Sequence, residues 1–328
     1  MKIAIVGATG AVGQQMLKCL EERNVPGDIK LLASARSKGK VFPYKGQDLV
    51  VEELCEDSFK DVDYALGATE NDITQMWMPW AQKENVVVVD NSSAYRLDKD
   101  VPLVIPEINP EDIFTHHGII ANPNCATIIA LMALNALHKE YHVKKIICST
   151  YQAVSGAGVK GIADLDNQTK DPSSKPTAFP YQIAYNLIPQ IGSFDDLGIS
   201  KEEWKMQNEG RKIWHHDDLL VSCTCVRVPI YRSHSESILI ECEKEVDVAQ
   251  ARTLIEKAEG CVLKDDPNNA VYPMPLDTTD QDLVFVGRIR KDISDPSGHS
   301  LSLFCCGDQI RKGAATNAVQ ILQKLLEA

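Results

Sequence analysis

The stretch that decides the fold is Lys2-Ile3-Ala4-Ile5-Val6, followed by Gly7-Ala8-Thr9-Gly10-Ala11-Val12-Gly13. The first run is typical of a strand that is buried on both faces of a sheet. A helix is expected over residues 14–23 and a second strand over residues 29–34, which completes a β-α-β unit. The three glycines allow a tight turn, close approach of the backbone to phosphate, and close packing of the helix. Because the helix N-terminus favours anions, the segment predicts a dinucleotide site; the alternative is a loop that only needs positive φ.

The pattern continues through the first 125 residues as strands that alternate with helices. Further strands are expected at residues 62–68, 86–90 and 118–121, with a helix over residues 73–83. This alternation predicts a parallel, doubly wound, Rossmann-like sheet.

The pattern changes after Cys125. Helices are expected at residues 126–141, 201–214 and 248–258, and strands at 145–152, 219–228, 237–245, 283–290 and 300–306, while residues 156–187 read as irregular. These elements predict an α+β domain with a mixed sheet and helices on one face. The last helix, over residues 311–326, is expected to return to the first domain. We therefore expect an NADP-binding domain at 1–125 plus 309–328, and a catalytic and dimerisation domain at 126–308.

The length of the chain predicts two domains, and its charge argues against some classes of partner. The chain has 328 residues, which at roughly 150 residues per domain suggests two domains. Its 34 basic and 46 acidic residues argue against nucleic acid or an anionic membrane as the main partner. No apolar run reaches the ~18 residues of a membrane span, and no signal peptide is visible. Ten scattered cysteines without zinc-type spacing predict reduced thiols in the cytoplasm and no metal site.

The end of the second strand indicates which cofactor is bound. An NAD site usually has an acidic residue there, whereas this chain has Ala33-Ser34-Ala35-Arg36-Ser37-Lys38. Small hydroxyls and cations suit a 2′-phosphate, which Arg36 can contact through its planar guanidinium. The segment therefore favours NADP, the alternative being a solvated basic turn.

Asn122-Pro123-Asn124-Cys125-Ala126-Thr127 contains the candidate nucleophile. Asn124 is a good N-cap, and Cys125 then falls in the first turn of an apolar helix. The helix dipole and the free N–H groups there favour a thiolate and can also bind an oxyanion. The alternative is a buried structural cysteine, which is what we expect of most of the other nine.

Two more candidates lie between the expected strands 219–228 and 237–245. His234, in a predicted loop, is a natural proton donor and acceptor near neutral pH, although a lone loop histidine is usually a surface residue. Arg227 shares a strand face with Cys223 and Cys225, where a buried guanidinium needs an anionic partner. At the last helix, Arg311 and Lys312 oppose the helix dipole, which indicates either a nearby anion or two solvated side chains.

These motifs together resemble the bacterial aspartate-β-semialdehyde dehydrogenase family. The resemblance runs along nearly the whole chain and includes V-G-A-T-G-A-V-G, S-A-R-S, D-N-S-S-A-Y-R, N-P-N-C-A-T, S-T-Y-Q-A-V-S-G-A-G, F-P-Y-Q-I-A-Y-N-L-I-P, E-E-W-K-M, C-V-R-V-P, R-S-H-S-E-S and R-K-G-A-A. One departure is Leu66-Gly67-Ala68-Thr69-Glu70, where the family loop has adjacent glycines followed by serine, so the role of this loop stays open.

The resemblance implies a role for each matching residue. Cys125 is the acylated nucleophile, next to Asn124, with His234 as general acid/base and Gln152 orienting the reacting group. Arg96 and Lys205 hold phosphate, while Glu202 and Arg227 grip the amino and carboxylate groups of the substrate. The NADP site is lined by Gly7, Thr9, Gly10, Ala11, Val12, Gly13, Arg36, Ser37, Ser155, Gly156 and Gln309.

The reaction that the resemblance implies is NADPH-dependent reductive dephosphorylation of L-aspartyl-4-phosphate to L-aspartate-4-semialdehyde through a cysteine thioester. It belongs to the biosynthesis of lysine (through diaminopimelate), methionine, threonine and isoleucine. The expected assembly is a homodimer or homotetramer built through the second domain. One alternative is an N-acetyl-γ-glutamyl-phosphate reductase, whose acylated amine would leave Glu202 without a cation. A glyceraldehyde-phosphate dehydrogenase and a catalytically inactive nucleotide sensor are more distant alternatives.

Overall fold

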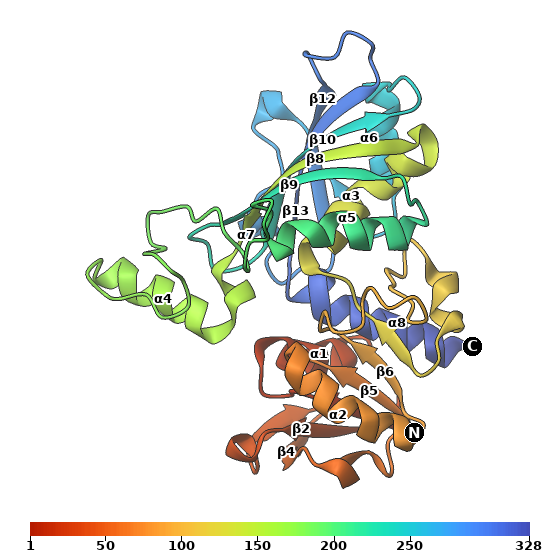
Figure 1. Cartoon of the computed structure of the whole chain (residues 1–328), viewed down its shortest axis with the longest axis vertical. Coiled ribbons are helices and arrows are strands. Elements are labelled where there is room, and N and C mark those ends of the chain that lie inside the picture. The colour runs from red at the N-terminus through yellow and green to blue at the C-terminus, as the bar shows by residue number, and fades with distance from the viewer. The chain divides into compact units, whose positions relative to one another are not determined.

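The computed structural model describes all residues from 1 to 328 and separates the chain into two compact units. The first unit comprises Met1–Asn124 and Ala314–Ala328, and the second comprises Cys125–Gly313. The chain therefore leaves the first unit once and returns to it for its last helix (Figure 1).

The first unit is built on one sheet of seven strands in the order β3-β4-β2-β1-β5-β6-β7. The strands are β1 (Lys2–Val6), β2 (Asp28–Ala33), β3 (Val41–Tyr44), β4 (Gln47–Glu53), β5 (Tyr64–Gly67), β6 (Val87–Asp90) and β7 (Ile119–Ala121). All neighbours are parallel except the β3–β4 pair. Strand order reverses at β1, so the carboxyl ends of β1 and β5 flank the switch point where such sheets bind ligands.

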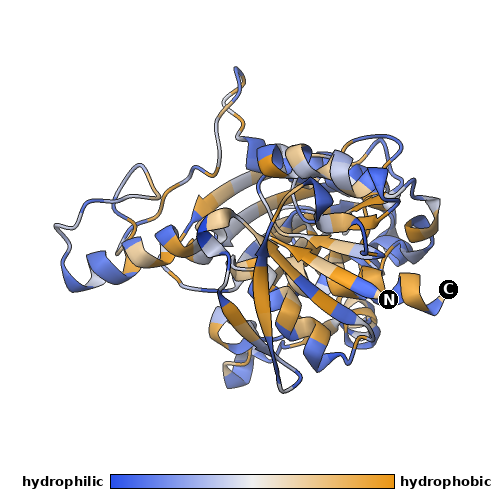
Figure 2. Ribbon diagram, turned by 90° about the horizontal axis from the view of Figure 1, so that it is seen from below, coloured by the Kyte–Doolittle hydropathy of each residue, from blue (hydrophilic) through white to orange (hydrophobic).

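Helices cover both faces of this sheet because its strands are apolar on both sides. Helices α1 (Ala11–Glu22) and α8 (Thr316–Glu327) pack against the face that carries Ile3 and Ile5. Helix α2 (Asn71–Lys83) covers the other face, where its Trp77 stacks on Phe59 at 5.6 Å between ring centroids. Figure 2 shows the hydrophobic strands between helices with hydrophilic outer turns.

The doubly wound sheet expected for the first unit is confirmed, with one hairpin added. Strands β3 and β4 were not expected, and β3 makes the sheet mixed at its edge. Lys45 and Gly46 join them with φ of 48° and 76°, the backbone of a tight hairpin turn. The side chains of β3 and β4 are mostly exposed and Pro43 interrupts β3, so the apolar pattern that identifies a strand is weak there.

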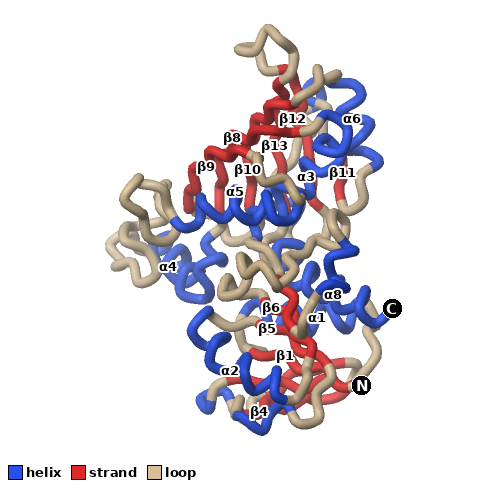
Figure 3. The backbone as a smooth tube through the Cα atoms, turned by 45° about the vertical axis from the view of Figure 1, so that its right-hand side comes forward, coloured by secondary structure: helices blue, strands red, loops and turns tan.

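The second unit is built on a mixed sheet of six strands in the order β11-β12-β13-β10-β8-β9. The strands are β8 (Val143–Gln152), β9 (Leu220–Arg227), β10 (His234–Cys242), β11 (Cys261–Leu263), β12 (Val284–Lys291) and β13 (Ser300–Gly307). Its helices are α3 (Cys125–Tyr141), α4 (Gly158–Lys170), α5 (Lys201–Trp214), α6 (Val248–Lys257) and the short α7 (Pro275–Thr278). Helices α3, α5 and α6 lie along one face of the sheet (Figure 3), as the α+β prediction requires.

The prediction of irregular structure over residues 156–187 is wrong in its first part, because α4 occupies Gly158–Lys170. Ile162 and Leu165 of this helix pack against Ile183 and Ile188 in a small separate core. Many polar side chains of α4 face solvent or bond to the segment that follows, which hid the helical period in the sequence.

Two further corrections concern the candidate residues. His234 does not lie in a loop: it is the first residue of β10, is fully buried, and pairs with Gly307 of β13. The last helix begins as a short π-helix over Arg311–Ala315 before α8 starts. Neither Arg311 nor Lys312 is solvated, because both are buried, and Arg311 pairs with Asp282 at 2.7 Å.

The glycine loop gives a prediction for folding stability. A Cβ on Gly13 would lie 2.3 Å from the carbonyl oxygen of Gly7, whereas a Cβ on Gly10 would lie 3.4 Å from the same atom. We expect Gly13→Ala to destabilise the protein by about 1–3 kcal/mol through overpacking against backbone. The matched control Gly10→Ala, at φ −77°, should change stability by less than about 0.5 kcal/mol. Urea denaturation checks both, and equal midpoints for the two variants would contradict this account.

Candidate active site

The glycine loop of the first unit has the shape of a phosphate cradle. Gly7 has φ of 87°, and a Cβ on it would lie 2.4 Å from the carbonyl oxygen of Ala68. Gly10 precedes the first residue of α1 and bonds back to Gly7 through its N–H at 3.0 Å. Ala11 and Val12 open α1, so their N–H groups belong to its first turn, which has no acidic side chain to compete with an anion.

The loop Gly67–Glu70 lies against this cradle because β5 is the neighbour of β1. The hydroxyl of Thr69 accepts a hydrogen bond from Trp77 Nε1 at 3.0 Å and lies 2.8 Å from the hydroxyl of Thr74. The departure from the family pattern at this loop is therefore accommodated by contacts to α2.

Arg36 and Ser37 form a short turn after β2. Ser37 is buried and its hydroxyl lies 3.3 Å from that of Thr9 in the glycine loop, while Arg36 is exposed. This turn is thus joined to the glycine loop and leaves a guanidinium free for an anionic ligand, as a 2′-phosphate would require.

Arg96 is buried in the first unit. Its Nε donates to the carbonyl of Asn122 at 2.9 Å and its Nη2 donates to that of Asn91 at 2.8 Å. These bonds attach the guanidinium to the segment that precedes Asn124 and Cys125.

Cys125 is the first residue of α3 and is partly exposed. This is the position at which free N–H groups and the helix dipole favour a thiolate. Gly313 lies against it, since a Cβ there would be 2.9 Å from Cys125 Cβ. Gly313 lies in the R-K-G-A-A motif, but its closeness to Cys125 depends on the fold and could not be predicted from that motif.

The ring of His234 has one nitrogen fixed by the backbone. Its Nδ1 accepts the N–H of Ala153 at 3.0 Å, so in the neutral ring the proton lies on Nε2. Burial, and next the charge of Arg227, lower the pKa of His234 to about 3, although Glu202 acts in the opposite direction. The ring is therefore neutral at physiological pH.

Gln152, Glu202 and Lys205 form a connected set beside this ring. Gln152 Nε2 donates to Glu202 at 3.2 Å and lies 3.4 Å from His234 Nε2. Glu202 is buried and pairs with Lys205 at 2.8 Å, across one turn of α5. Two N–H donors do not bond to each other, so the Nε2 proton of His234 remains available to an incoming oxygen.

Arg227 ends β9 beside the same group. It is buried, and its Nη1 donates to the carbonyl of Ala153 at 2.6 Å. Burial lowers the pKa of Arg227, while attraction to Glu202 and to Cys125 partly offsets this. A Cβ on Gly156 would lie 2.8 Å from this Nη1 and 3.6 Å from His234 Cε1, so Gly156 leaves room for both side chains.

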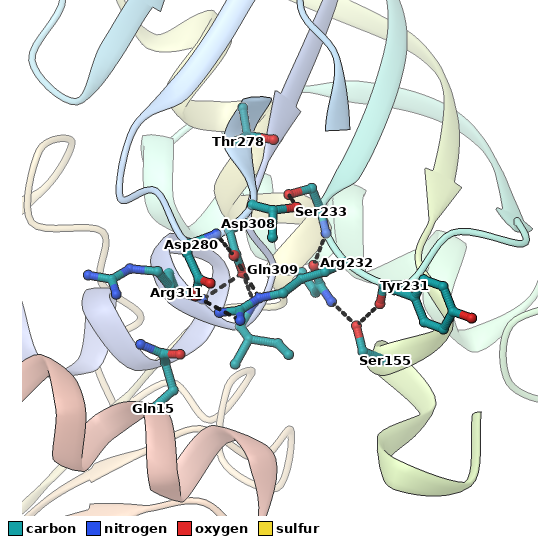
Figure 4. Close-up of polar contacts among 12 residues, drawn as sticks. Gln15, Ser155, Tyr231, Arg232, Ser233, Thr278, Asp280, Asp308, Gln309 and Arg311 are labelled. Atoms are coloured by element: carbon teal, nitrogen blue, oxygen red, sulfur yellow. Dashed lines mark hydrogen bonds and ion pairs between the residues drawn. The ribbon is translucent and has the colours of Figure 1, made fainter. Parts of the chain in front are cut away.

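A second polar network holds the turn that precedes His234 (Figure 4). The buried carboxylate of Asp308 pairs with Arg232 at 2.7 Å and accepts the N–H groups of Asp280, Ile310 and Arg311 at 2.8–3.0 Å. Gln309 accepts the N–H of Ser233 at 2.7 Å and donates to the hydroxyl of Ser155 at 2.5 Å. Asp308 and Arg232 could not be assigned from the sequence, because a buried ion pair cannot be distinguished from surface charges without the fold.

The structure thus brings together, within the second unit, Gln152, Gly156, Glu202, Lys205, Arg227 and His234, with Cys125 near enough to act on Arg227. The expected nucleotide contacts Ser155 and Gln309 bond to each other, and Ser155 also bonds to the carbonyl of Tyr231. The glycine loop, Arg36, Ser37, Arg96 and Asn124 belong to the first unit. No group of three or more histidine, cysteine or acidic residues could hold a metal ion, and no helix could cross a membrane.

Comparison with known proteins defines the class. The family described as semialdehyde dehydrogenase, NAD binding domain, matches residues 2–116, and that described as semialdehyde dehydrogenase, dimerisation domain, matches residues 134–312. The fold is thus that of the two-domain semialdehyde dehydrogenases.

Individual relatives narrow this class. The aspartate-semialdehyde dehydrogenase of Aquifex aeolicus is 50% identical, over 99% of this chain and 98% of the relative. The crystal structure of aspartate semialdehyde dehydrogenase II from Vibrio cholerae, complexed with ASA, is 41% identical with a TM-score of 0.96, covering 99% of this chain and 98% of that one. That of Candida albicans, solved with NADP, is 25% identical with a TM-score of 0.77 and covers 99% and 98%.

The chain belongs to the aspartate-semialdehyde dehydrogenase family. The predictions of family, fold class, NADP-dependent dehydrogenase activity and cofactor are therefore confirmed. The relatives do not favour the alternative of an N-acetyl-γ-glutamyl-phosphate reductase.

The buried ring of His234 gives a prediction for pH dependence. Its pKa is about 3 in the folded chain and about 6.5 unfolded, so below pH 6.5 the unfolded state binds the extra proton and stability falls. This histidine should cost the protein about 2 kcal/mol of stability between pH 7.5 and pH 5.0. We expect the loss to be smaller by that amount in His234→Asn, measured by urea denaturation at both pH values. An equal loss in the wild type and in His234→Asn would refute the assignment.

Proposed function

We propose that this chain catalyses the NADPH-dependent reductive dephosphorylation of L-aspartyl-4-phosphate to L-aspartate-4-semialdehyde, a step in the biosynthesis of lysine, methionine, threonine and isoleucine. The observation that carries the proposal is the cluster of a neutral His234, Gln152, Glu202 and Arg227 in the unit whose first residue is the helix-start Cys125. Such a cluster combines a nucleophile, a proton-bearing ring and a pair of opposite charges for an amino-acid substrate.

The first step falls to Cys125. Its thiolate attacks the C4 carbonyl of the acyl phosphate, the S–C bond forms, and the C–O bond to phosphate breaks. The electron pair leaves on the phosphate oxygen, which takes up a proton. The result is a thioester on Cys125. Arg96 and Lys205 supply the cations that the leaving phosphate needs.

His234 acts at the reacting oxygen. Because Ala153 occupies Nδ1, the ring presents its proton at Nε2. That N–H donates to the carbonyl oxygen as negative charge develops there in each tetrahedral state. Gln152 donates to Glu202 and lies beside the ring edge of His234, which is a positioning role.

Glu202 and Arg227 recognise the amino-acid end of the substrate. The Glu202 carboxylate suits the ammonium group and the Arg227 guanidinium suits the α-carboxylate. Both are buried, so each gains from a ligand charge that replaces lost water.

The first unit fits the cofactor. A Cβ on Gly7 or Gly13 would collide with the backbone of Ala68 or Gly7, so these glycines let the loop fold tightly before α1, whose first turn has no acidic side chain to repel a pyrophosphate. Gly7, Thr9, Gly10, Ala11, Val12 and Gly13 would hold the phosphates, Arg36 and Ser37 the 2′-phosphate, and Ser155, Gly156 and Gln309 the nicotinamide end. When bound, NADPH supplies the hydride that reduces the thioester to the aldehyde level.

The proposed function is tested by replacing the thiol of Cys125. We expect Cys125→Ser to lose at least about 1000-fold in turnover, because an alcohol at this position lacks the thiolate. NADPH binding should stay within about twofold, since the cofactor residues are untouched. Absorbance at 340 nm, with aspartate semialdehyde, phosphate and NADP⁺, measures the reverse reaction. Phosphate-dependent activity that survives in Cys125→Ser, with Cys55→Ser as control, would disprove the nucleophile.

We propose that two chains associate through the sheet of the second unit. Helices α3, α5 and α6 cover one face, and on the other face β8 presents Ile147, Ser149 and Tyr151. Ile147 is 44% exposed, and Tyr151 packs beside Phe304 of β13. The family description of a dimerisation domain agrees with association through this unit.

The ten free cysteines support a reducing, cytoplasmic location.

The dimer face can be tested by mass in solution. Light scattering should give twice 36.3 kDa for the wild type, or four times this mass if dimers pair further. Ile147→Glu should shift the protein to a single chain, because it places a charge in an apolar contact. Val50→Glu, at an exposed residue of β4 in the first unit, is the control. A wild-type monomer, or an unchanged Ile147→Glu oligomer, would refute the proposed face.

A further inference from the structure

The guanidinium of Arg227 is bonded through one nitrogen and lies over an aromatic ring, while its other donors make no hydrogen bond. Nη1 is fixed by the carbonyl of Ala153, and the ring of Phe179 lies 5.8 Å from the guanidinium carbon. Nε and Nη2 make no hydrogen bond within the chain. The guanidinium is therefore oriented by the protein with two donor groups left for a ligand.

Phe179 belongs to the segment after α4, and the side chain of Asp164 fixes that segment. The Asp164 carboxylate accepts the N–H of Thr177 at 2.8 Å, the hydroxyl of Thr177 at 2.7 Å and the N–H of Ala178 at 2.7 Å. Burial would raise the pKa of Asp164, but these hydrogen bonds outweigh it and lower the pKa. The carboxylate is thus ionised and holds the backbone next to Phe179.

The same helix fixes the next part of the segment. Gln168, one turn further along α4, accepts the N–H groups of Ile183 and Ala184 at 2.8 and 3.2 Å. Ile188 then pairs with the backbone of Arg227 through two hydrogen bonds of 2.8 and 3.0 Å. The segment 177–188 is therefore tied to α4 at one end and to the backbone of Arg227 at the other.

We propose that α4 and residues 177–188 form a clamp that positions Arg227 for the α-carboxylate of the substrate, with Phe179 as the positioning residue whose ring lies beneath the guanidinium carbon. The proposal rests on the role of Arg227 given above. A ring over the guanidinium attracts its charge without using an N–H, so it orients the group while leaving Nε and Nη2 for the carboxylate. A carboxylate from the protein would instead compete with the substrate.

The clamp predicts an effect confined to one substrate. In Phe179→Leu, the KM for aspartate semialdehyde should rise about tenfold, because the guanidinium loses a partly desolvated cation–π contact. The KM for phosphate should stay within about twofold. Phe179→Tyr keeps the ring and should restore the wild-type KM. Lys175→Ala, at an exposed residue just before the segment 177–188, is the matched control.

Separate outcomes test the clamp and the role of Arg227. If Arg227→Lys raises the KM for the semialdehyde but Phe179→Leu does not, the clamp is refuted and the role of Arg227 stands. If Arg227→Lys leaves that KM unchanged, the role of Arg227 itself is wrong. If Phe179→Leu lowers thermal stability and kcat without a selective rise in this KM, Phe179 is only structural. In the double variant the two effects should be less than additive, since both act on one contact.

Discussion

The site depends on the backbone of one residue, Ala153. Its N–H donates to Nδ1 of His234, and its carbonyl accepts from Nη1 of Arg227. Both bonds are made in a buried, poorly solvated position, where a wrong orientation of either side chain would leave a polar group without a partner. Because Ala153 follows directly on β8, the sheet itself sets the orientation of the ring and of the guanidinium. The proton on His234 and the free donors of Arg227 both follow from this arrangement.

The sequence predicted the elements that have a strong apolar period and the motifs that carry chemistry. The β-α-β start, the helix that begins beside Asn124, and α5 with both Glu202 and Lys205 on one face were all within reach of pattern and capping rules. Helix α4 was missed because its contacts are made by polar side chains such as Asp164 and Gln168, whose bonds go to backbone far along the chain. Roles taken from the resemblance could be attached to Ser155 and Gln309, but their mutual hydrogen bond depends on tertiary structure alone.

In the second unit, the candidate site lies at the ends of the strands, and the covered face of the sheet lies behind it. On the covered face, β8 carries Cys148, Thr150 and Gln152 in alternation, and β9 carries Cys223, Cys225 and Arg227. The thiols behind the site are inert, since burial helps raise the pKa of Cys148 to about 11. Glu236 lies on β10 two residues after His234, and burial raises the pKa of its carboxyl group well above the usual range. The opposite charges of Glu202, in the first turn of α5, and of Arg227, the last residue of β9, lie beside the carboxyl ends of β8 and β9.

The chain passes between the two units at two points, and both points are next to Cys125. The second unit begins at Cys125 and ends at Gly313, and a side chain on Gly313 would collide with Cys125. Gly313 falls within the π-helix Arg311–Ala315, a local departure from α geometry that proteins often place at functional sites. Asp308 fixes the start of this π-helix through the N–H groups of Ile310 and Arg311, and it also pairs with Arg232 in the turn before His234. One buried carboxylate thus ties the segment behind the thiol to the turn that begins the histidine strand. This structural role explains why Asp308, which was not among the expected site residues, is buried and bonded through both of its carboxylate oxygens.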